Sequence, residues 1–223
     1  MRLHSRWYAS RGNRRCFAHV REARWGPGVL ARLRPWLRPA GRPVKRALAR
    51  VTLWRLRWVY LREDIDGVAA ELRTLRTGHA EGLRRFGARV AKDAMVVGPL
   101  SIVNAKQDFG NLSIGKGTHI GSEVFVDLAE RVVVESGATI SMRTMIITHF
   151  DAGRSALAER FPRRTGPVRI GRDAYVGAGC IVLHGVTVGE GALVGAGVVV
   201  TEDVPAGAIL TREGLRAQKD RRP

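Results

Sequence analysis

The 223-residue chain has little of several features that would define its class at once. Its two cysteines, Cys16 and Cys180, lie far apart and lack the spacing of a metal site or of a disulfide framework. It contains no run of 18 apolar residues, so we expect no transmembrane helix. Residues 1–30 contain many arginines and lack the apolar core of a signal peptide, which argues against secretion. We therefore expect a reduced, cytoplasmic protein.

Positive charge is abundant but unevenly distributed, with a formal net charge of +18. Residues 1–89 hold 22 Lys/Arg against 6 Asp/Glu, a net of +16, whereas residues 90–223 hold 16 against 14, a net of +2. A strongly basic chain suggests nucleic acid or an anionic membrane as a partner. Because the excess lies in an N-terminal extension, we do not expect the main domain to bind nucleic acid.

The extension has two parts. Residues 1–43 are rich in Arg, Gly, Pro and Trp without periodicity, and we expect them to be poorly ordered. Residues 44–88 have apolar side chains at three- and four-residue spacings, which predicts an amphipathic, basic helical region. Tryptophans among its arginines suggest peripheral membrane contact through residues 44–76. Alternatively, this helix packs against the rest of the protein or a neighbouring subunit, with its arginines in water.

From residue 89 onward, aliphatic residues recur every sixth position. Asp108 interrupts the series once, and the phase slips by two after Val132. A glycine follows many of the aliphatic residues. The aliphatic positions are Val90, Val96, Ile102, Ile114, Ile120, Val126 and Val132, then Val134, Ile140 and Ile146, then Ile170, Val176, Val182, Val188, Val194 and Val200.

A six-residue repeat fits one short strand followed by one tight corner. Three such units close a triangular coil of about eighteen residues, whose aliphatic side chains stack into a continuous interior. Glycine at the corners permits positive φ angles and close approach between coils. The pattern predicts an all-β solenoid, a parallel β-helix of about five to six coils over residues 89–207, followed by a short basic C-terminal tail at residues 208–223.

Hexads written [Ile/Leu/Val]-Gly-x-x-x-x resemble those of the left-handed parallel β-helix family, and this resemblance supplies the hand of the coil. Residues 112–205 are similar to the maltose, galactoside and colanic-acid O-acetyltransferase branch of the hexapeptide-repeat acyltransferases. The motifs that carry the similarity are LSIGKG (112–117), VDLAER (126–131), ISMRTMIITH (140–149), GPVRIGRDAYVGAG (166–179) and GVTVGEGALVGAGVVVTEDVP (185–205). The resemblance implies a homotrimer that transfers an acyl group from acetyl-CoA, as co-substrate, to a hydroxyl of a sugar-like acceptor.

The period is interrupted at length only by a loop at residues 149–167, and long loops on rigid scaffolds commonly serve binding. His149 stands at the mouth of this loop, and the resemblance assigns it as the catalytic base. A neutral imidazole can accept the proton of a hydroxyl as that hydroxyl attacks a thioester. Backbone N–H groups at a corner can stabilise the resulting oxyanion.

The resemblance also places acyl-CoA in a groove between adjacent subunits. Carried over to this sequence, the residues for the pantetheine and acyl region are Ala178, Ala196 and Thr201. Arg216 and Lys219 are two basic residues suited to the 3′-phosphate of the coenzyme.

Two aspartates are candidates for the acceptor side. Asp127 is a candidate ligand of an acceptor hydroxyl, and Asp151 is a candidate to orient the loop or His149. The sequence departs from the family at Glu202, where a lysine is usual. Its carboxylate would repel coenzyme phosphate.

Two rival interpretations remain. A γ-class carbonic anhydrase shares the prism, but His119, His149 and His184 lack the spacing of its zinc ligands, so we expect no bound metal. The other rival is a catalytically inactive hexapeptide scaffold whose basic N-terminus binds membrane or nucleic acid. The sequence does not identify the acceptor.

Overall fold

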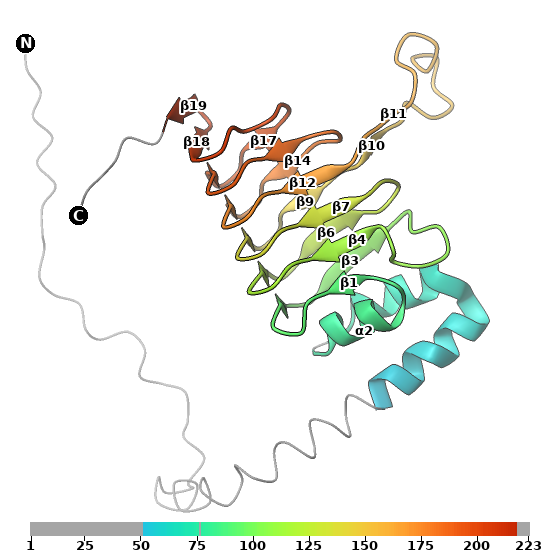
Figure 1. The fold of residues 1–223 in the computed structure, drawn as a ribbon. Helices are drawn as coiled ribbons and strands as arrows, with labels where there is room; N and C mark the ends of the chain where they lie inside the picture. Colours follow the sequence, from blue (N-terminus) through green and yellow to red (C-terminus); the bar gives the residue numbers. More distant parts are fainter. Residues whose placement is uncertain (1–50, 76, 218–223) are drawn as a thin grey trace, which may run out of the picture. The chain divides into compact units, whose positions relative to one another are not determined.

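The computed structural model describes residues 51–75 and 77–217. The expectation for residues 1–43 and the proposed phosphate contact at Lys219 lie outside the described residues. Within the described part, short strands wind into a stack of coils with helices at its N-terminal end (Figure 1).

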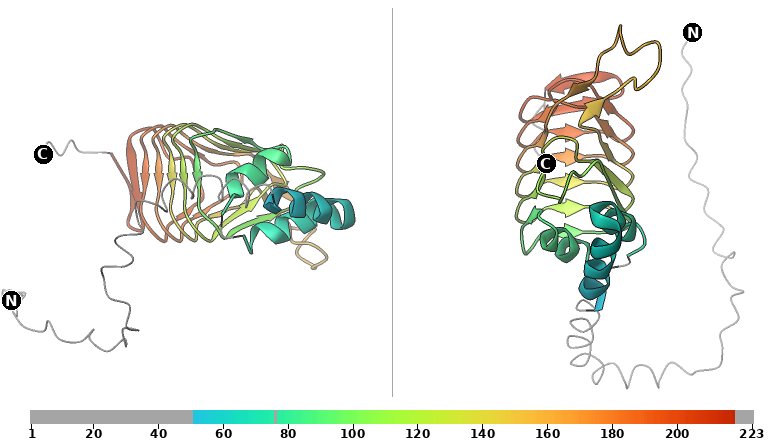
Figure 2. Two further views of the ribbon diagram at one scale, coloured as in Figure 1. Left: turned by 90° about the horizontal axis from the view of Figure 1, so that it is seen from below. Right: turned by 90° about the vertical axis from the view of Figure 1, so that its right-hand side faces the viewer.

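The coils form three sheets, which are the three sides of a prism, and their strands are parallel except for the last, β19 (Gly214–Ala217) (Figure 2). The first sheet contains β1 (Arg89–Val90), β4 (Leu112–Ile114), β7 (Val132–Val134), β12 (Val168–Ile170) and β15 (Thr187–Val188). The second contains β2 (Met95–Val96), β5 (His119–Ile120), β8 (Thr139–Ile140), β13 (Tyr175–Val176), β16 (Leu193–Val194), β18 (Ala208–Thr211) and β19 (Gly214–Ala217). The third contains β3 (Leu100–Val103), β6 (Val124–Asp127), β9 (Met145–Ile146), β14 (Ile181–Val182) and β17 (Val199–Val200).

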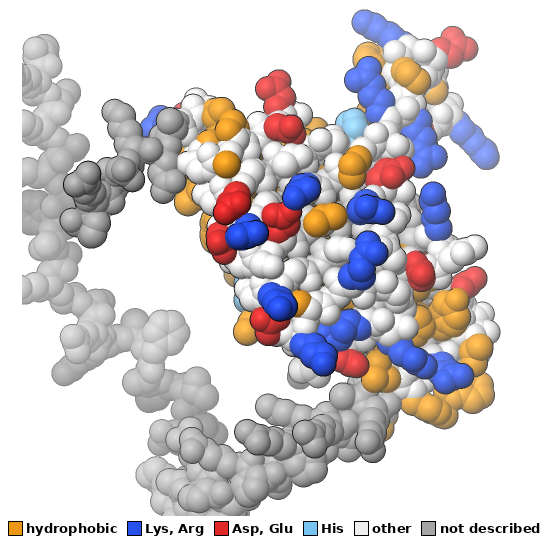
Figure 3. Space-filling view, viewed as in Figure 1, with side chains coloured by type: hydrophobic (Ala, Val, Ile, Leu, Met, Phe, Trp, Pro, Cys, Tyr) orange, Lys and Arg blue, Asp and Glu red, His pale blue; other side chains and the backbone are white. Residues whose placement is uncertain are grey.

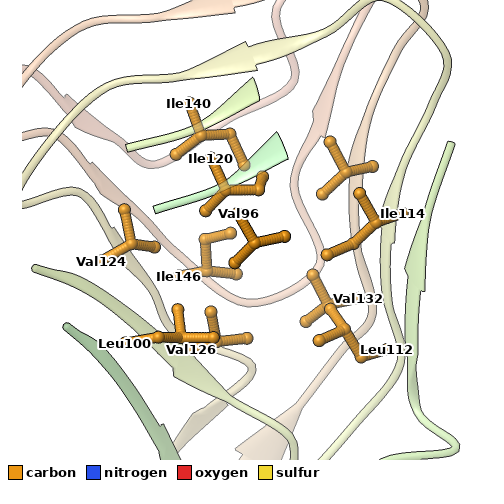
Figure 4. A pocket seen from close by; sticks show the side chains of 11 residues that line it. Val96, Leu100, Leu112, Ile114, Ile120, Val124, Val126, Val132, Ile140 and Ile146 are labelled. Carbon is orange, nitrogen blue, oxygen red and sulfur yellow. The ribbon is translucent and has the colours of Figure 1, made fainter. Parts of the chain in front are cut away.

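The predicted parallel β-helix is confirmed, with five complete coils and the beginning of a sixth. Each strand pairs with the strand one coil away, so that Val176, for example, is in register with Ile140 and Val194. Backbone N–H and C=O groups are therefore satisfied along the axis of the stack. The aliphatic residue of each hexad points inward, and Figure 4 shows such side chains facing one another inside the prism.

Glycines serve the corners in two distinct ways. An added Cβ at Gly177 would lie 2.6 Å from the backbone nitrogen of Ala196 in the next coil, so only glycine allows the coils to approach this closely. Gly179 instead has open space around it but a φ of 67°, which disfavours other residues. Close approach and positive φ were both expected, and they occur at different positions of the repeat.

All extra residues fall at one corner, between the third sheet and the first. A regular hexad spans six residues there, from Val182 to Val188. The corresponding steps span twelve from Ile102 to Ile114, eight from Val126 to Val134 and twenty-four from Ile146 to Ile170. The break at Asp108 and the slip after Val132 are thus insertions at the same edge of the prism as the long loop. We call this edge the site corner.

The long loop leaves the site corner as a two-stranded ribbon, which is visible in Figure 1 as an arm projecting from the stack. Strand β10 (His149–Phe150) pairs antiparallel with β11 (Arg164–Thr165), and His149 lies opposite Thr165. At the C-terminal end, β18 pairs parallel with β16 and antiparallel with β19. Residues 208–217 therefore continue the second sheet and cover its edge, where the sequence had suggested a tail.

The helical N-terminal part packs against the β-helix. Residues 51–72 are helical but bend at Asp64, whose φ is 59° (Figure 1). The bend brings Arg55 within 2.9 Å of Glu71, sixteen residues later. A buried face of this bent helix joins the same apolar cluster as the coils and contains Leu56, Ile65, Val68, Ala69 and Leu72. Among the described residues, no helix is long and apolar enough to cross a membrane.

The short helix α2 (His79–Arg85) follows, and its first residue is a buried histidine. The His79 Nε2 atom lies 3.1 Å from the carbonyl oxygen of Leu72, whereas Nδ1 has no hydrogen-bond partner among the described residues. Burial lowers the pKa of His79, against the opposing effect of the Leu72 hydrogen bond. The neutral imidazole is therefore the form that this packing favours.

Candidate active site

A pocket opens at the site corner, and its walls come from all three insertions. The extra residues after β3, the turn after β6 and the β10–β11 ribbon each contribute side chains. The lining residues are Asn104, Lys106, Ala129, Glu130, His149, Asp151, Arg163 and Thr165. The site corner thus brings together segments up to 61 positions apart in the sequence, from 104 to 165.

His149 is held by a buried carboxylate. Its Nδ1 atom lies 2.6 Å from Oδ2 of Asp127, and the two side chains are 28% and 1% exposed. Asp127 ends β6 and His149 begins β10, so the stacking of consecutive coils at the site corner creates this contact. With Nδ1–H donating to Asp127, the Nε2 lone pair of His149 is free to accept a proton.

The Asp127 carboxylate accepts several further hydrogen bonds. Asn104 Nδ2 donates to Oδ1 at 2.8 Å, and the backbone N–H and Oγ1 of Thr148 donate to Oδ2, each at 2.8 Å. The backbone N–H of Ala129 also donates to Oδ1, at 3.1 Å. Burial raises the pKa of Asp127, but the hydrogen bonds from Asn104, His149 and Thr148 outweigh it and lower that pKa to about 2. Asp127 is therefore an anion beside His149 at neutral pH.

Asp151 lies in the same pocket, at the start of the loop. Its Oδ1 accepts a hydrogen bond of 2.7 Å from the backbone N–H of Gly153, and its Oδ2 is 3.9 Å from Nε of Arg163. These contacts tie the two sides of the ribbon together. They fit the expectation that Asp151 orients the loop. This role of Asp151 stays a prediction, and so does the binding of an acceptor hydroxyl by Asp127.

The residues predicted for acyl-CoA do not all lie at the site corner of the single chain. Ala178 and Ala196 occupy equivalent positions in successive coils, at the corner between the second and third sheets, and Gly197 N–H donates to the Ala178 carbonyl oxygen at 2.9 Å. Thr201 follows β17 and is exposed at the site corner. Arg216 is exposed on β19 and forms an ion pair with Glu213. One chain does not bring Ala178 or Ala196 together with His149 at the same corner.

Sequence reasoning missed Asn104, Lys106 and Glu130. Asn104 has a φ of 57°, a conformation that asparagine tolerates better than most residues, and its side chain holds Asp127. The one sequence signal that could have revealed Asn104 and Lys106 was the break in the six-residue period at Asp108. The structure shows that this break is an insertion and not a degenerate repeat. Among the described residues, no group of three or more His, Cys, Asp or Glu side chains could hold a metal ion.

Comparisons with known proteins agree with the fold. The family profile described as "Hexapeptide repeat of succinyl-transferase" matches residues 167–202. Nodulation protein L of Rhizobium meliloti (strain 1021) is 40% identical over 116 residues, which are 50% of this chain and 63% of that protein. The matched segment therefore spans less than two thirds of that relative.

Two solved structures have similar coils. A hexapeptide-repeat-containing acetyltransferase from Vibrio cholerae superposes with a TM-score of 0.58 at 20% identity, covering 78% of this chain and 93% of that one. A galactoside acetyltransferase in complex with coenzyme A superposes with a TM-score of 0.60 at 18% identity, covering 74% and 82%. These findings support the parallel β-helix fold, and the family profile identifies a hexapeptide repeat at residues 167–202. The resemblance of the chain to hexapeptide-repeat acetyltransferases is confirmed.

Proposed function

We propose that the protein is an acyl-CoA-dependent O-acyltransferase, with acetyl-CoA as donor and a sugar-like hydroxyl compound as acceptor. The observation that carries this proposal is the Asp127–His149 contact of 2.6 Å at the mouth of the site-corner pocket. The similarity to Nodulation protein L over the coils and to CoA-binding β-helix structures supports the same reaction class. Because acyl-CoA is an intracellular metabolite, a cytoplasmic location is part of the proposal.

In this reaction the acceptor hydroxyl enters the pocket and its oxygen attacks the thioester carbonyl carbon. As the C–O bond forms, His149 Nε2 accepts the hydroxyl proton, so no free alkoxide is needed. The C–S bond then breaks, and the departing CoA thiolate accepts this proton from the imidazolium of His149. Asp127 acts as a positioning residue that holds the Nδ1–H tautomer and stabilises the imidazolium charge.

A homotrimer is the second element of the proposal. The acyl-CoA residues Ala178, Ala196 and Thr201 line the coils from β13 onward, and Arg216 and Lys219 would meet the 3′-phosphate. Since Ala178 and Ala196 lie at a different corner from His149, a neighbouring copy would supply the donor face to the site corner. Glu202 stands next to Thr201 and would weaken the hold on the coenzyme phosphates.

The acceptor pocket is polar and carries both signs of charge. Its lining includes the basic Lys106 and Arg163, the acidic Glu130 and Asp151, and the uncharged polar Asn104 and Thr165. Such a lining suits a polyhydroxylated ligand, because each hydroxyl can both donate and accept. Asp151 would fix the loop that closes this side of the pocket.

The test is a thiol-release assay with acetyl-CoA over a panel of sugars, oligosaccharides and glycolipid precursors. We expect release that depends on one class of acceptor, with the acetyl ester on that acceptor detected by mass spectrometry. Size-exclusion chromatography with light scattering tests the trimer. A folded protein that acetylates no acceptor of the panel would favour the inactive-scaffold interpretation instead.

A further inference from the structure

The first arm of the bent helix, residues 51–63, has a second apolar face that the other described residues leave uncovered. Val51, Trp54, Trp58 and Leu61 are 63%, 65%, 51% and 70% exposed. We call these four residues the tryptophan stripe. The Trp54 and Trp58 rings contact each other edge to face, with centroids 5.7 Å apart. In Figure 3, hydrophobic side chains gather beside Lys and Arg side chains at the helical end of the molecule.

The stripe lies opposite the buried face of the same helix. At about 100° per residue, its four members fall within an arc of about 80°, nearly opposite the buried Leu56. Arg55 and Arg62 flank it on one side and Arg57 on the other. This helix buries one face in the protein core and exposes a second apolar face. Such an exposed apolar face can be covered by a lipid membrane or by another protein.

A pocket with two arginines adjoins the stripe. Its lining residues are Arg57, Tyr60, Leu61, Arg85, Phe86, Gly87, Gln107 and Asp108, so Leu61 belongs to both features. The ring centroids of Tyr60 and Phe86 are 5.4 Å apart, and the two rings form an aromatic wall of the pocket. The Asp108 Oδ1 atom accepts a hydrogen bond of 2.7 Å from the Gly110 N–H. Within residues 51–75 and 77–217, neither Arg57 nor Arg85 has an ion-pair partner.

We propose that the tryptophan stripe and the Arg57–Arg85 pocket together form a docking surface for an anionic phospholipid membrane. The stripe inserts its indoles and aliphatic side chains at the level of the headgroups, where tryptophan is favoured. The two guanidiniums bind lipid phosphate, which they can contact through paired N–H donors. This surface shares no lining residue with the pocket that contains His149.

Charge complementarity selects this partner over the alternatives. Arg57, Arg62 and Arg85 surround the stripe, and residues 1–89 carry a net charge of +16, which an anionic bilayer attracts. A second copy of this chain would bring an equally basic surface against them. Nucleic acid would use open aromatic faces for stacking, whereas here the two indoles meet edge to face and share the stripe with Val51 and Leu61. The exposed carboxylates Glu63, Asp64 and Asp66 lie at the bend, beyond the end of the stripe.

Vesicle co-sedimentation of the full chain tests the proposal. One set of vesicles contains phosphatidylcholine and phosphatidylglycerol, and the other contains phosphatidylcholine alone. We expect binding to the anionic vesicles that weakens as salt increases. Trp54→Ser with Trp58→Ser should weaken this binding about tenfold or more. Arg57→Gln with Arg85→Gln should weaken it about fivefold for each charge removed.

Matched controls separate the surface from overall charge and hydrophobicity. Lys116→Gln with Arg212→Gln removes two exposed charges elsewhere, and Val199→Ser removes an exposed apolar side chain on β17. These variants should bind as the wild type does, and every variant should keep its thermal midpoint. Unchanged vesicle binding by both surface variants would overturn the proposal, as would failure of the wild type to bind anionic vesicles. A change of oligomer size in the tryptophan variant without an effect on vesicle binding would assign the stripe to contact between copies, which also overturns it.

Discussion

The fourth and fifth coils differ from the first three in how strictly they repeat. In residues 168–200 an aliphatic residue recurs at every sixth position without interruption. The matched family profile covers this stretch. The first three coils each carry extra residues at the site corner, and the pocket with Asp127 and His149 lies there. The comparison shows that the regular coils only continue the repeat, whereas the irregular ones hold the pocket and the Asp127–His149 contact that we propose for acyl transfer. Variants in the two regions should therefore fail in different ways.

The largest effect is expected at the site corner. His149→Ala removes the proposed proton acceptor and should lower kcat for acyl transfer by about two orders of magnitude or more. The thermal midpoint should change little, because the side chain is partly exposed on the ribbon. Thiol release and thermal unfolding of the same preparation check both statements. Wild-type turnover in His149→Ala would remove this residue from the mechanism.

Asp127→Asn should also lower kcat, by about tenfold or more, with little change in the KM for acetyl-CoA. The Asn amide can donate to Nδ1 of His149 and so favour the tautomer whose Nε2 carries the proton and cannot act as a base. The same substitution should change the response to acid. The pKa of Asp127 is lowered to about 2, so its stabilising effect is present above pH 3.8 and is lost as the pH falls towards 2. The wild-type free energy of unfolding should decline more steeply over that window than that of the variant. Equal acid profiles would contradict this assignment.

Gly177→Ala tests the regular coils. Its new Cβ would meet the backbone of Ala196, so we expect a loss of about 1–3 kcal/mol in the free energy of unfolding. Gly179→Ala is the matched control, since it meets no neighbour within 4 Å and pays only for its φ of 67°, about 1 kcal/mol. Denaturant unfolding of the two variants measures the difference. Equal losses would mean that the spacing of the coils adapts to a methyl group.

The smallest effect is expected at the helical end. Burial lowers the pKa of His79, so its neutral form contributes stability above pH 6.5 that is lost as the pH falls below that value. His79→Gln, which cannot be protonated, should make stability less dependent on pH between 7 and 5. Thermal midpoints over this range, compared with those of the wild type, test the expectation. An unchanged slope would show that His79 has the same pKa in the folded and unfolded chains, which would contradict the lowered pKa.

The sequence predicted the regular coils better than it predicted the contacts at the site corner. The aliphatic hexads are local, so they revealed the strands, the corners and the inward side of each coil. His149 became a candidate because it stands where the period stops, and its role as a base remains a prediction from the family resemblance. The partnership of Asp127 with His149 was not predicted, because it depends on how two coils stack across an insertion. Asn104 was missed for the same reason, and the bend at Asp64 has no periodic signature at all.

Placing every insertion at one edge has a further consequence for how such a protein can change. The strands of successive coils stay paired in register on both sides of the site corner, so residues inserted at this corner do not change the strand pairing of the three sheets. Length and composition there are free to vary while the interior stays in register. Grafting segments from relatives into residues 152–162 keeps Asn104 and the core in place, so it is a direct way to look for new acceptor preferences of the proposed enzyme.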